Sequence, residues 1–290
     1  MIDKKKDIRD DEFRVIGKKI NGGSKTRRQG KGFLIALVLF VALLIGLLAI
    51  LKWPKANTED PEGGVFDPDP TPITALDVTP FGDVTDSVWT QRLDTTVNDV
   101  HLAIFIPHNS VPELMLGVPS GDDLILAAQA ADIRADNKKI LGAFVLKGEP
   151  LAWGLSKRGF CAIIDGQVTV GVSDNSPLFE EATDKGGYFF RQYPLVDNGV
   201  LVENEPKNKT MRKAICVRAG QHFVVVSETD ESLHDFAQAL VDLGVENAIY
   251  LVGGHGSGGW WRDVSGALSP FDPETRSGSY KNENYIVWRR

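Results

Sequence analysis

Hydrophobic residues recur along the C-terminal two-thirds of the chain in short runs that are bounded by turn-forming residues. Runs of four to eight apolar or β-branched residues between Gly, Asn, Asp and Pro are typical of β-strands. On this pattern we expect strands at residues 101–106, 159–164, 167–172, 214–218, 222–227 and 248–252. The pattern therefore predicts an α+β fold class: a strand-rich domain with few helices.

Helical periodicity is clearest over residues 231–243, and a weaker pattern predicts another helix over 122–135. Thr229 or Asp230 can cap the start of the clearer helix, and Gly244 can end it. Its apolar residues recur at the spacing of one helical face, namely Leu233, Phe236, Ala237, Leu240 and Val241. Strand, helix and strand thus follow one another, and such a crossover predicts that the second strand runs parallel to the first.

A glycine-rich segment directly follows the second of these strands, with five glycines among residues 253–259. Missing side chains allow backbone N–H groups to approach an anion, and ligands often bind beyond the carboxyl ends of strands. The alternative is a mobile loop with tight turns. The candidate ligand-binding residues of this segment are Gly253, Gly254, Gly256 and Ser257.

Three aromatic residues in or beside this segment could carry chemistry. His255 can transfer a proton near neutral pH. Trp260 and Trp261 can stack on the face of a sugar.

Residues 32–51 carry no charge and are almost wholly aliphatic. Twenty helical residues span about 30 Å, the hydrocarbon thickness of a bilayer. A buried core helix would keep a polar stripe, and a signal peptide has a shorter apolar region before a small-residue cleavage site. We therefore predict one transmembrane helix at 32–52, with membrane lipid as its partner.

The flanks of this span predict its orientation. Residues 1–31 hold eleven Lys or Arg, which indicates a basic cytoplasmic segment. A basic arm for nucleic acid is the alternative. We predict a single-pass protein of the cell (inner) membrane, with a Pro-, Gly- and acid-rich linker at 53–81 and an extracytoplasmic domain at 82–290.

Charge and cysteine content narrow the choice of ligands. Residues 1–55 have a net charge of +8 and the rest of the chain −15, which disfavours a general nucleic-acid binder. Cys161 and Cys216 could form a disulfide or be two buried thiols. Neither a Cys-x-x-Cys pair nor a His-Glu-x-x-His pair occurs, so we expect no metal site and no cofactor.

Four segments resemble motifs of the phosphodiester glycosidase family, in the family's order over about residues 100–265. These are Leu141-Gly142-Ala143-Phe144, Arg191-Gln192-Tyr193-Pro194, Arg212-Lys213-Ala214-Ile215-Cys216 and Leu251-Val252-Gly253-Gly254-His255-Gly256-Ser257. The resemblance implies a cleft for a glycosyl phosphodiester or related glycan. It places Gln192 and Tyr193 among the substrate-binding residues. Arg212 is suited to grip phosphate oxygens.

At four positions the segments differ from the family motifs, and these differences bear on catalysis. Leu141 replaces an asparagine, Val252 an aspartate, Lys213 a threonine and His255 a glycine. Two hypotheses follow. The domain is a hydrolase in which Arg212 and His255 are catalytic, or it is an inactive glycan-binding or accessory module. No sequence argument places any of the spare carboxylates in the cleft: Asp165, Asp174, Glu180, Glu181 and Asp263.

Overall fold

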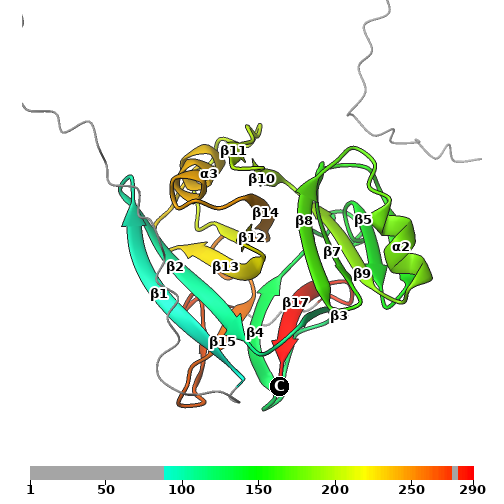
Figure 1. Cartoon of the computed structure of the whole chain (residues 1–290), viewed down its shortest axis with the longest axis horizontal. Coiled ribbons are helices and arrows are strands. Elements are labelled where there is room, and N and C mark those ends of the chain that lie inside the picture. Colours follow the sequence, from blue (N-terminus) through cyan, green and yellow to red (C-terminus); the bar gives the residue numbers. More distant parts are fainter. Residues whose placement is uncertain (1–87, 276–279) are drawn as a thin grey trace, which may run out of the picture. The chain divides into compact units, whose positions relative to one another are not determined.

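The computed structural model describes residues 88–275 and 280–290, all within the unit Pro68–Arg290. The predicted cytoplasmic segment, span and linker (1–31, 32–52 and 53–81) lie outside these residues. No helix in the described part is long and apolar enough to cross a membrane. The described residues form three antiparallel sheets and two short helices (Figure 1).

Sheet I has seven strands, and the first two strands of the chain form one edge of it. In spatial order the strands are β1 (Trp89–Val97), β2 (Val100–His108), β13 (Gln221–Ser227), β12 (Lys213–Arg218), β14 (Asn247–Leu251), β10 (Pro194–Asp197) and β11 (Val200–Leu201).

Sheets II and III have five strands each. Sheet II is ordered β16 (Leu268–Pro270), β15 (Gly259–Arg262), β4 (Leu124–Gln129), β17 (Asn284–Arg289) and β3 (Pro112–Leu116). Sheet III is ordered β6 (Glu149–Trp153), β5 (Ala143–Leu146), β9 (Tyr188–Gln192), β7 (Gly159–Ile164) and β8 (Gln167–Val172).

The six predicted strands are all present, which confirms the strand-rich class. The helix predicted over 122–135 is wrong, because this segment forms β4. Residues Leu124–Ala128 of β4 are all buried, because some of their side chains pack in the large cluster shared by the sheets and the others in a second cluster with Tyr285 and Val287. A strand buried on both faces has a continuous apolar run, which periodicity cannot distinguish from a buried helix.

The predicted strand–helix–strand unit is β13, α3 (Leu233–Asp242) and β14. Both strands pair antiparallel with β12, so they run parallel to each other as predicted, with β12 between them. The cap of α3 is Ser232 and not Thr229 or Asp230, because the Ser232 hydroxyl accepts the Asp235 N–H at 3.0 Å. Gly244, with φ +82°, follows the helix end as predicted.

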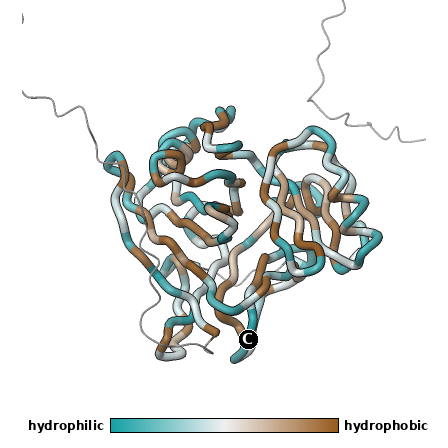
Figure 2. Tube along the Cα trace, viewed as in Figure 1, coloured by the Kyte–Doolittle hydropathy of each residue, from teal (hydrophilic) through white to brown (hydrophobic). Residues whose placement is uncertain are grey.

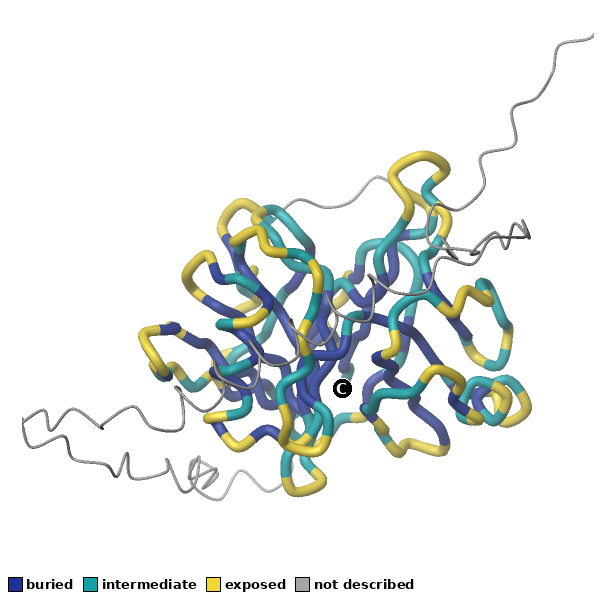
Figure 3. Tube along the Cα trace, turned by 90° about the horizontal axis from the view of Figure 1, so that it is seen from above, coloured by how far each residue is buried: buried dark blue, intermediate teal, exposed yellow. Residues whose placement is uncertain are grey.

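One hydrophobic cluster is shared by all three sheets, with Phe105 from sheet I, Trp288 from sheet II and Phe190 from sheet III. Helix α3 covers the other face of sheet I, and α2 (Leu178–Asp184) packs on sheet III. The strands are mainly hydrophobic and buried, whereas the turns are polar and exposed (Figures 2 and 3). Cys161 and Cys216 are both buried free thiols.

The meeting of the sheets positions the candidate site. The chain passes from β9 of sheet III to β10 of sheet I through Tyr193, whose carbonyl accepts the Tyr250 N–H at 2.8 Å. Gly159 allows this close approach, since a Cβ there would lie 2.6 Å from the Gln192 carbonyl oxygen. The ends of β4, β9 and β14 thereby come close to one another.

Candidate functional site

A buried ammonium and a partly exposed carboxylate lie where these strand ends meet. Lys157 donates hydrogen bonds to the Asp132 carboxylate and, at 2.9 Å, to Gln192 Oε1. The Lys157 ammonium also lies 4.5 Å from the centre of the Tyr193 ring. The Lys157 side chain is 5% exposed and that of Asp132 is 32% exposed. The backbone carbonyl of Asp132 accepts the Leu141 N–H at 2.8 Å, which ties the backbone of this residue to the first family-like segment.

The Tyr250 hydroxyl connects the remaining segments. It accepts the Gly253 N–H at 3.1 Å and an Arg212 Nη1–H at 3.4 Å. Its ring meets that of Tyr193 edge-on, with centroids 6.5 Å apart. Burial raises the pKa of Tyr250, so the phenol stays protonated at neutral pH. We call five side chains the Asp132 cluster: Asp132, Lys157, Gln192, Tyr193 and Tyr250.

Arg212 is buried and is held mainly by backbone carbonyl groups. Its Nε–H donates to Glu231 O at 2.7 Å, and Nη2 donates to Asn208 O. The described contacts link its guanidinium to the Asp132 cluster through Tyr250, and none joins it to His255. Its role in phosphate binding stays a prediction.

Most backbone donors of the glycine loop, residues 253–258, are hydrogen-bonded within the chain. Gly254 N–H donates to Met211 O at 2.8 Å, and Ser257 N–H donates to Gly254 O at 3.2 Å. The Ser257 hydroxyl also donates to Gly254 O, at 2.6 Å. Gly256 N–H donates to Asp272 Oδ2 at 3.1 Å, so this N–H is already bonded to a carboxylate of the chain.

His255 bridges two carboxylates at the outer side of this loop. Its Nε2 lies 2.9 Å from Asp230 Oδ1, and its Nδ1 lies 3.1 Å from Asp272 Oδ2. These hydrogen bonds, with that to Asp230 the stronger influence, raise the pKa of His255. The imidazole is half exposed and is favoured in its charged form. Its proposed role in proton transfer stays a prediction.

Lys213 donates hydrogen bonds to the C-terminal end of the glycine loop. Its side chain is fully buried, and Nζ donates to Gly258 O at 3.0 Å and to Ser257 O at 3.3 Å. Burial lowers the pKa of Lys213 to about 7, although the nearby Asp272 opposes this shift.

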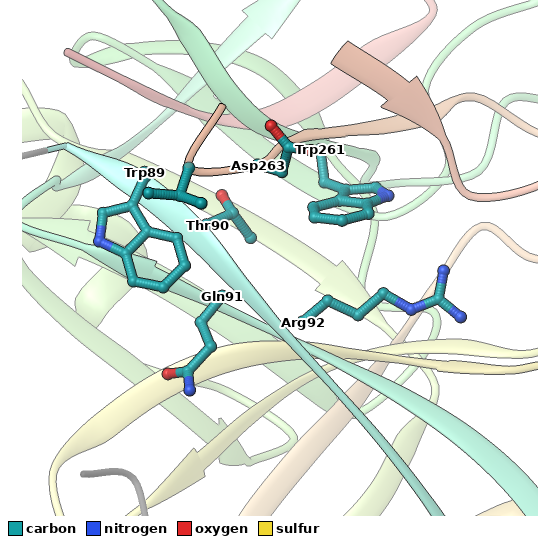
Figure 4. A pocket seen from close by; sticks show the side chains of 7 residues that line it. Trp89, Thr90, Gln91, Arg92, Trp261 and Asp263 are labelled. Carbon is teal, nitrogen blue, oxygen red and sulfur yellow. The ribbon is translucent and has the colours of Figure 1, made fainter. Parts of the chain in front are cut away.

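Trp261 lines a separate pocket of about 410 Å³ beside β1 (Figure 4). The indoles of Trp89 and Trp261 lie on either side of Thr90 in this view. Trp260 points to the other face of β15 and packs on Tyr285, with ring centroids 5.9 Å apart. Only one of the two predicted tryptophans therefore lines this pocket, whose residues are Trp89, Thr90, Gln91, Arg92, Trp261, Asp263 and Val264.

The structure separates the predicted site residues into groups. Gln192, Tyr193, Arg212 and Gly253 converge around Tyr250. The others belong to the glycine loop or to β15. The sequence did not indicate three residues of the Asp132 cluster. Asp132, Lys157 and Tyr250 lie outside all four family-like segments. The only available signal was Tyr250, which directly precedes the fourth segment.

These features define a three-sheet domain with one polar cluster at the meeting of the sheets. The sequence profile of the phosphodiester glycosidase family matches residues 123–282, more than half of the chain. The chain belongs to the phosphodiester glycosidase family.

Two solved structures resemble this fold. The zebrafish N-acetylglucosamine-1-phosphodiester alpha-N-acetylglucosaminidase catalytic domain, auto-inhibited by its pro-peptide, is 13% identical with a TM-score of 0.51, covering 70% of this chain and 83% of that chain. A hypothetical protein from Synechocystis is 15% identical with a TM-score of 0.53, covering 69% of this chain and 62% of that chain. No curated protein matches the sequence.

Proposed function

We propose that the domain binds and hydrolyses a glycosyl phosphodiester at the Asp132 cluster. The observation that carries this proposal is the convergence of all four family-like segments there. In the first segment, the Leu141 N–H donates to the backbone carbonyl of Asp132. The second segment contributes Gln192 and Tyr193. The third and fourth segments reach the Tyr250 hydroxyl through Arg212 and Gly253.

The chemistry of the cluster suits a ligand that joins a sugar to a phosphate. Lys157 and Arg212 supply positive charge within a domain that is acidic overall, so an anion would be held by local contacts. Tyr250 accepts two hydrogen bonds from N–H groups, which leaves its own O–H proton to donate. The zebrafish relative is an N-acetylglucosamine-1-phosphodiester glycosidase, which supports this substrate class.

Binding without turnover is the second candidate function. It is favoured by Leu141 and Val252, which lack the polar groups of the family motifs. It is also favoured by the glycine loop, most of whose N–H groups are already hydrogen-bonded within the chain. Losing one positioned polar group lowers the rate of an enzyme by about 10²–10⁴.

The experiment that separates the candidates uses the purified full-length chain in mild detergent. The substrates are methyl phosphodiesters of N-acetylglucosamine, glucose and mannose. Free sugar released measures turnover, and titration calorimetry measures binding. Turnover supports hydrolysis. If the wild type binds but is inactive, while Leu141→Asn with Val252→Asp gains turnover, the natural chain is a binding module. If it neither binds nor cleaves any of them, both candidates are rejected.

We further propose that the span at 32–52 holds this domain on the outer side of the membrane. The support is the uncharged apolar run and the basic flank at residues 1–31. In spheroplasts, externally added protease should then degrade the domain at 82–290 while leaving a cytoplasmic marker intact. Protection of the domain until the membrane is permeabilised would contradict this orientation.

A further inference from the structure

We propose that Asp132 is the catalytic carboxylate of this chain and that Lys157 is the residue that positions it. This inference rests on the proposed hydrolysis of a glycosyl phosphodiester. It assigns the reaction to a carboxylate that lies outside all four family-like segments.

The burial of the two charges is the first support. The Lys157 ammonium is almost fully buried, while the carboxylate that it holds is about one-third exposed. A buried ammonium is costly unless a partner offsets its desolvation. Lys157 has such partners in Asp132 and Gln192, and it also faces the ring of Tyr193. The pair therefore presents a carboxylate of fixed orientation at a surface that solvent can reach.

The rigidity of the surroundings is the second support. The backbone of Asp132 is bonded to Leu141, and Gln192 accepts the Tyr193 N–H at 3.0 Å through the same Oε1 that binds Lys157. The carboxylate is thus fixed from its backbone and from its side chain. Such fixation is what a reacting group requires.

Two other carboxylates near the family-like segments, Asp272 and Asp230, are engaged with the glycine loop. Asp272 is buried and accepts the N–H groups of Gly256 and Glu274, and it also bonds to His255. Asp230 bonds to the other nitrogen of His255. Asp132 belongs to the cluster that the four segments reach, since its carboxylate bonds Lys157, its backbone carbonyl accepts the Leu141 N–H, and Arg212 and Gly253 bond the Tyr250 hydroxyl.

The reaction can be written with this carboxylate as the base. The oxygen of a water attacks C1 of the sugar, and the bond between C1 and the phosphate oxygen breaks. The electron pair of that bond leaves with the phosphate monoester, whose charge is spread over several oxygens, so the leaving group does not need a proton. Asp132 accepts the proton of the water and later releases it to solvent.

The experiment compares Asp132→Asn with Asp136→Asn in the full-length chain. Asp136 lies in the same loop but is exposed and paired with Arg134, so it is a matched control. We expect Asp132→Asn to lower kcat for methyl-phosphodiester cleavage by about 10²–10⁴ with a KM within a few-fold of wild type. The control should retain the wild-type kcat, and circular dichroism should show folded protein for both.

Chemical rescue adds a measurement that a merely structural role would not change. In Asp132→Gly, sodium azide should restore turnover and yield a glycosyl azide, because the small anion replaces the water and needs no base. Should Asp132→Asn fail to fold, Asp132→Glu keeps the charge, displaces the carboxylate by one methylene, and should still lose most of kcat.

Lys157→Gln tests the positioning role. It should lower kcat by a smaller factor than Asp132→Asn and leave KM nearly unchanged, because the carboxylate remains but loses its fixed orientation. An unchanged kcat in folded Lys157→Gln would show that Lys157 does not position Asp132.

The outcomes distinguish this inference from the proposed function. An active wild type whose kcat survives Asp132→Asn within about three-fold overturns the role of Asp132 and leaves the hydrolase intact. A wild type that is inactive on all three substrates rejects the hydrolase itself, and the role of Asp132 with it.

Discussion

The glycine loop and the Asp132 cluster are both built at strand ends, but they use their polar groups in opposite ways. In the glycine loop, backbone N–H groups are bonded to carbonyls of the chain or to Asp272, and Lys213 donates to two of the loop's own carbonyls. In the Asp132 cluster, a buried cation holds a carboxylate that remains partly exposed. The comparison shows that a glycine-rich segment can have most of its backbone donors bonded within the chain, while a partly exposed carboxylate is held at a residue that no motif marks.

The loop nevertheless sets the position of the cluster, because Gly253 donates to Tyr250. A Cβ at residue 253 would collide with the Tyr250 hydroxyl and lie 2.6 Å from Met211 O. We therefore expect Gly253→Ala to lower the free energy of unfolding by about 3 kcal/mol, the upper end for overpacking. It should also lower turnover by displacing Tyr250.

Gly254→Ala is the matched control for this change. Residue 254 has φ +86°, but its nearest neighbour would be Thr210 Oγ1 at 3.6 Å. The expected cost is backbone strain of about 1–2 kcal/mol. Urea unfolding of both variants measures the difference, and equal losses would show that the contact with Tyr250 and Met211 is unimportant.

The second prediction concerns the buried Lys213. Its pKa is about 7 in the folded protein and ordinarily 10.5, so the unfolded chain binds more protons between these values. Stability should therefore rise with pH above about 7, by about 2–3 kcal/mol between pH 6 and pH 9 from this group. Lys213→Met should remove this rise, and denaturant titrations at both pH values test it. A Met variant that keeps the full rise would contradict the assignment.

The smallest expected effects concern Asp272, the carboxylate that is hydrogen-bonded to the loop, and His255. Asp272→Asn weakens the charge-assisted hydrogen bonds to Gly256 and Glu274, and should cost about 1–2 kcal/mol at neutral pH. His255→Gln should cost less than about 1 kcal/mol, because the imidazole is half exposed and its ion pairs are screened.

The pH dependence of these two groups has opposite signs. Partial burial pushes the pKa of Asp272 up, but the N–H groups of Glu274 and Gly256, with His255, hold it below 3.8. Its contribution to stability is present above pH 3.8 and is lost as pH falls through the lowered value. The pKa of His255 is raised above 6.5, so its contribution is present below pH 6.5 and is lost as pH rises through the raised value.

Thermal unfolding from pH 3 to pH 9 would check these signs. The thermal stability of Asp272→Asn should differ most from that of wild type between pH 3.8 and pH 6.5, and the two should converge as pH falls through the lowered pKa of Asp272. A difference between the variant and wild type that grows toward pH 3 would show that Asp272 is not held in its charged form.

Much of the fold followed from local patterns in the sequence. Four strands of sheet I and two of sheet III are short apolar runs between turn residues and were predicted, and α3 has a clear apolar face. Other strands of these sheets, such as β1 with its many polar residues, lack that pattern and were not predicted. β4 was missed because burial on both faces removes the alternation that identifies a strand. That error also concealed Asp132, which follows β4 and would otherwise have stood at a strand end.

The candidate site was predictable only in part, since it depends on contacts between distant segments. The motifs indicated Gln192, Tyr193 and Gly253, which the structure brings near Tyr250. The pairing of Asp132 with Lys157 joins residues 25 positions apart, and no local spacing indicates it. The bonds within the glycine loop depend in the same way on Asp272 and Lys213, which come from other parts of the fold.

The most direct test of this account is a crystal structure of the chain with a non-hydrolysable phosphonate analogue of N-acetylglucosamine 1-phosphate methyl ester. The account predicts that the anomeric carbon lies against the Asp132 carboxylate, about 3–3.5 Å from it or separated by one water. It also predicts that the phosphonate lies near Tyr250, with the bond between Gly256 and Asp272 intact. An analogue bound to the N–H groups of the glycine loop beside His255, with Asp272 displaced, would contradict it.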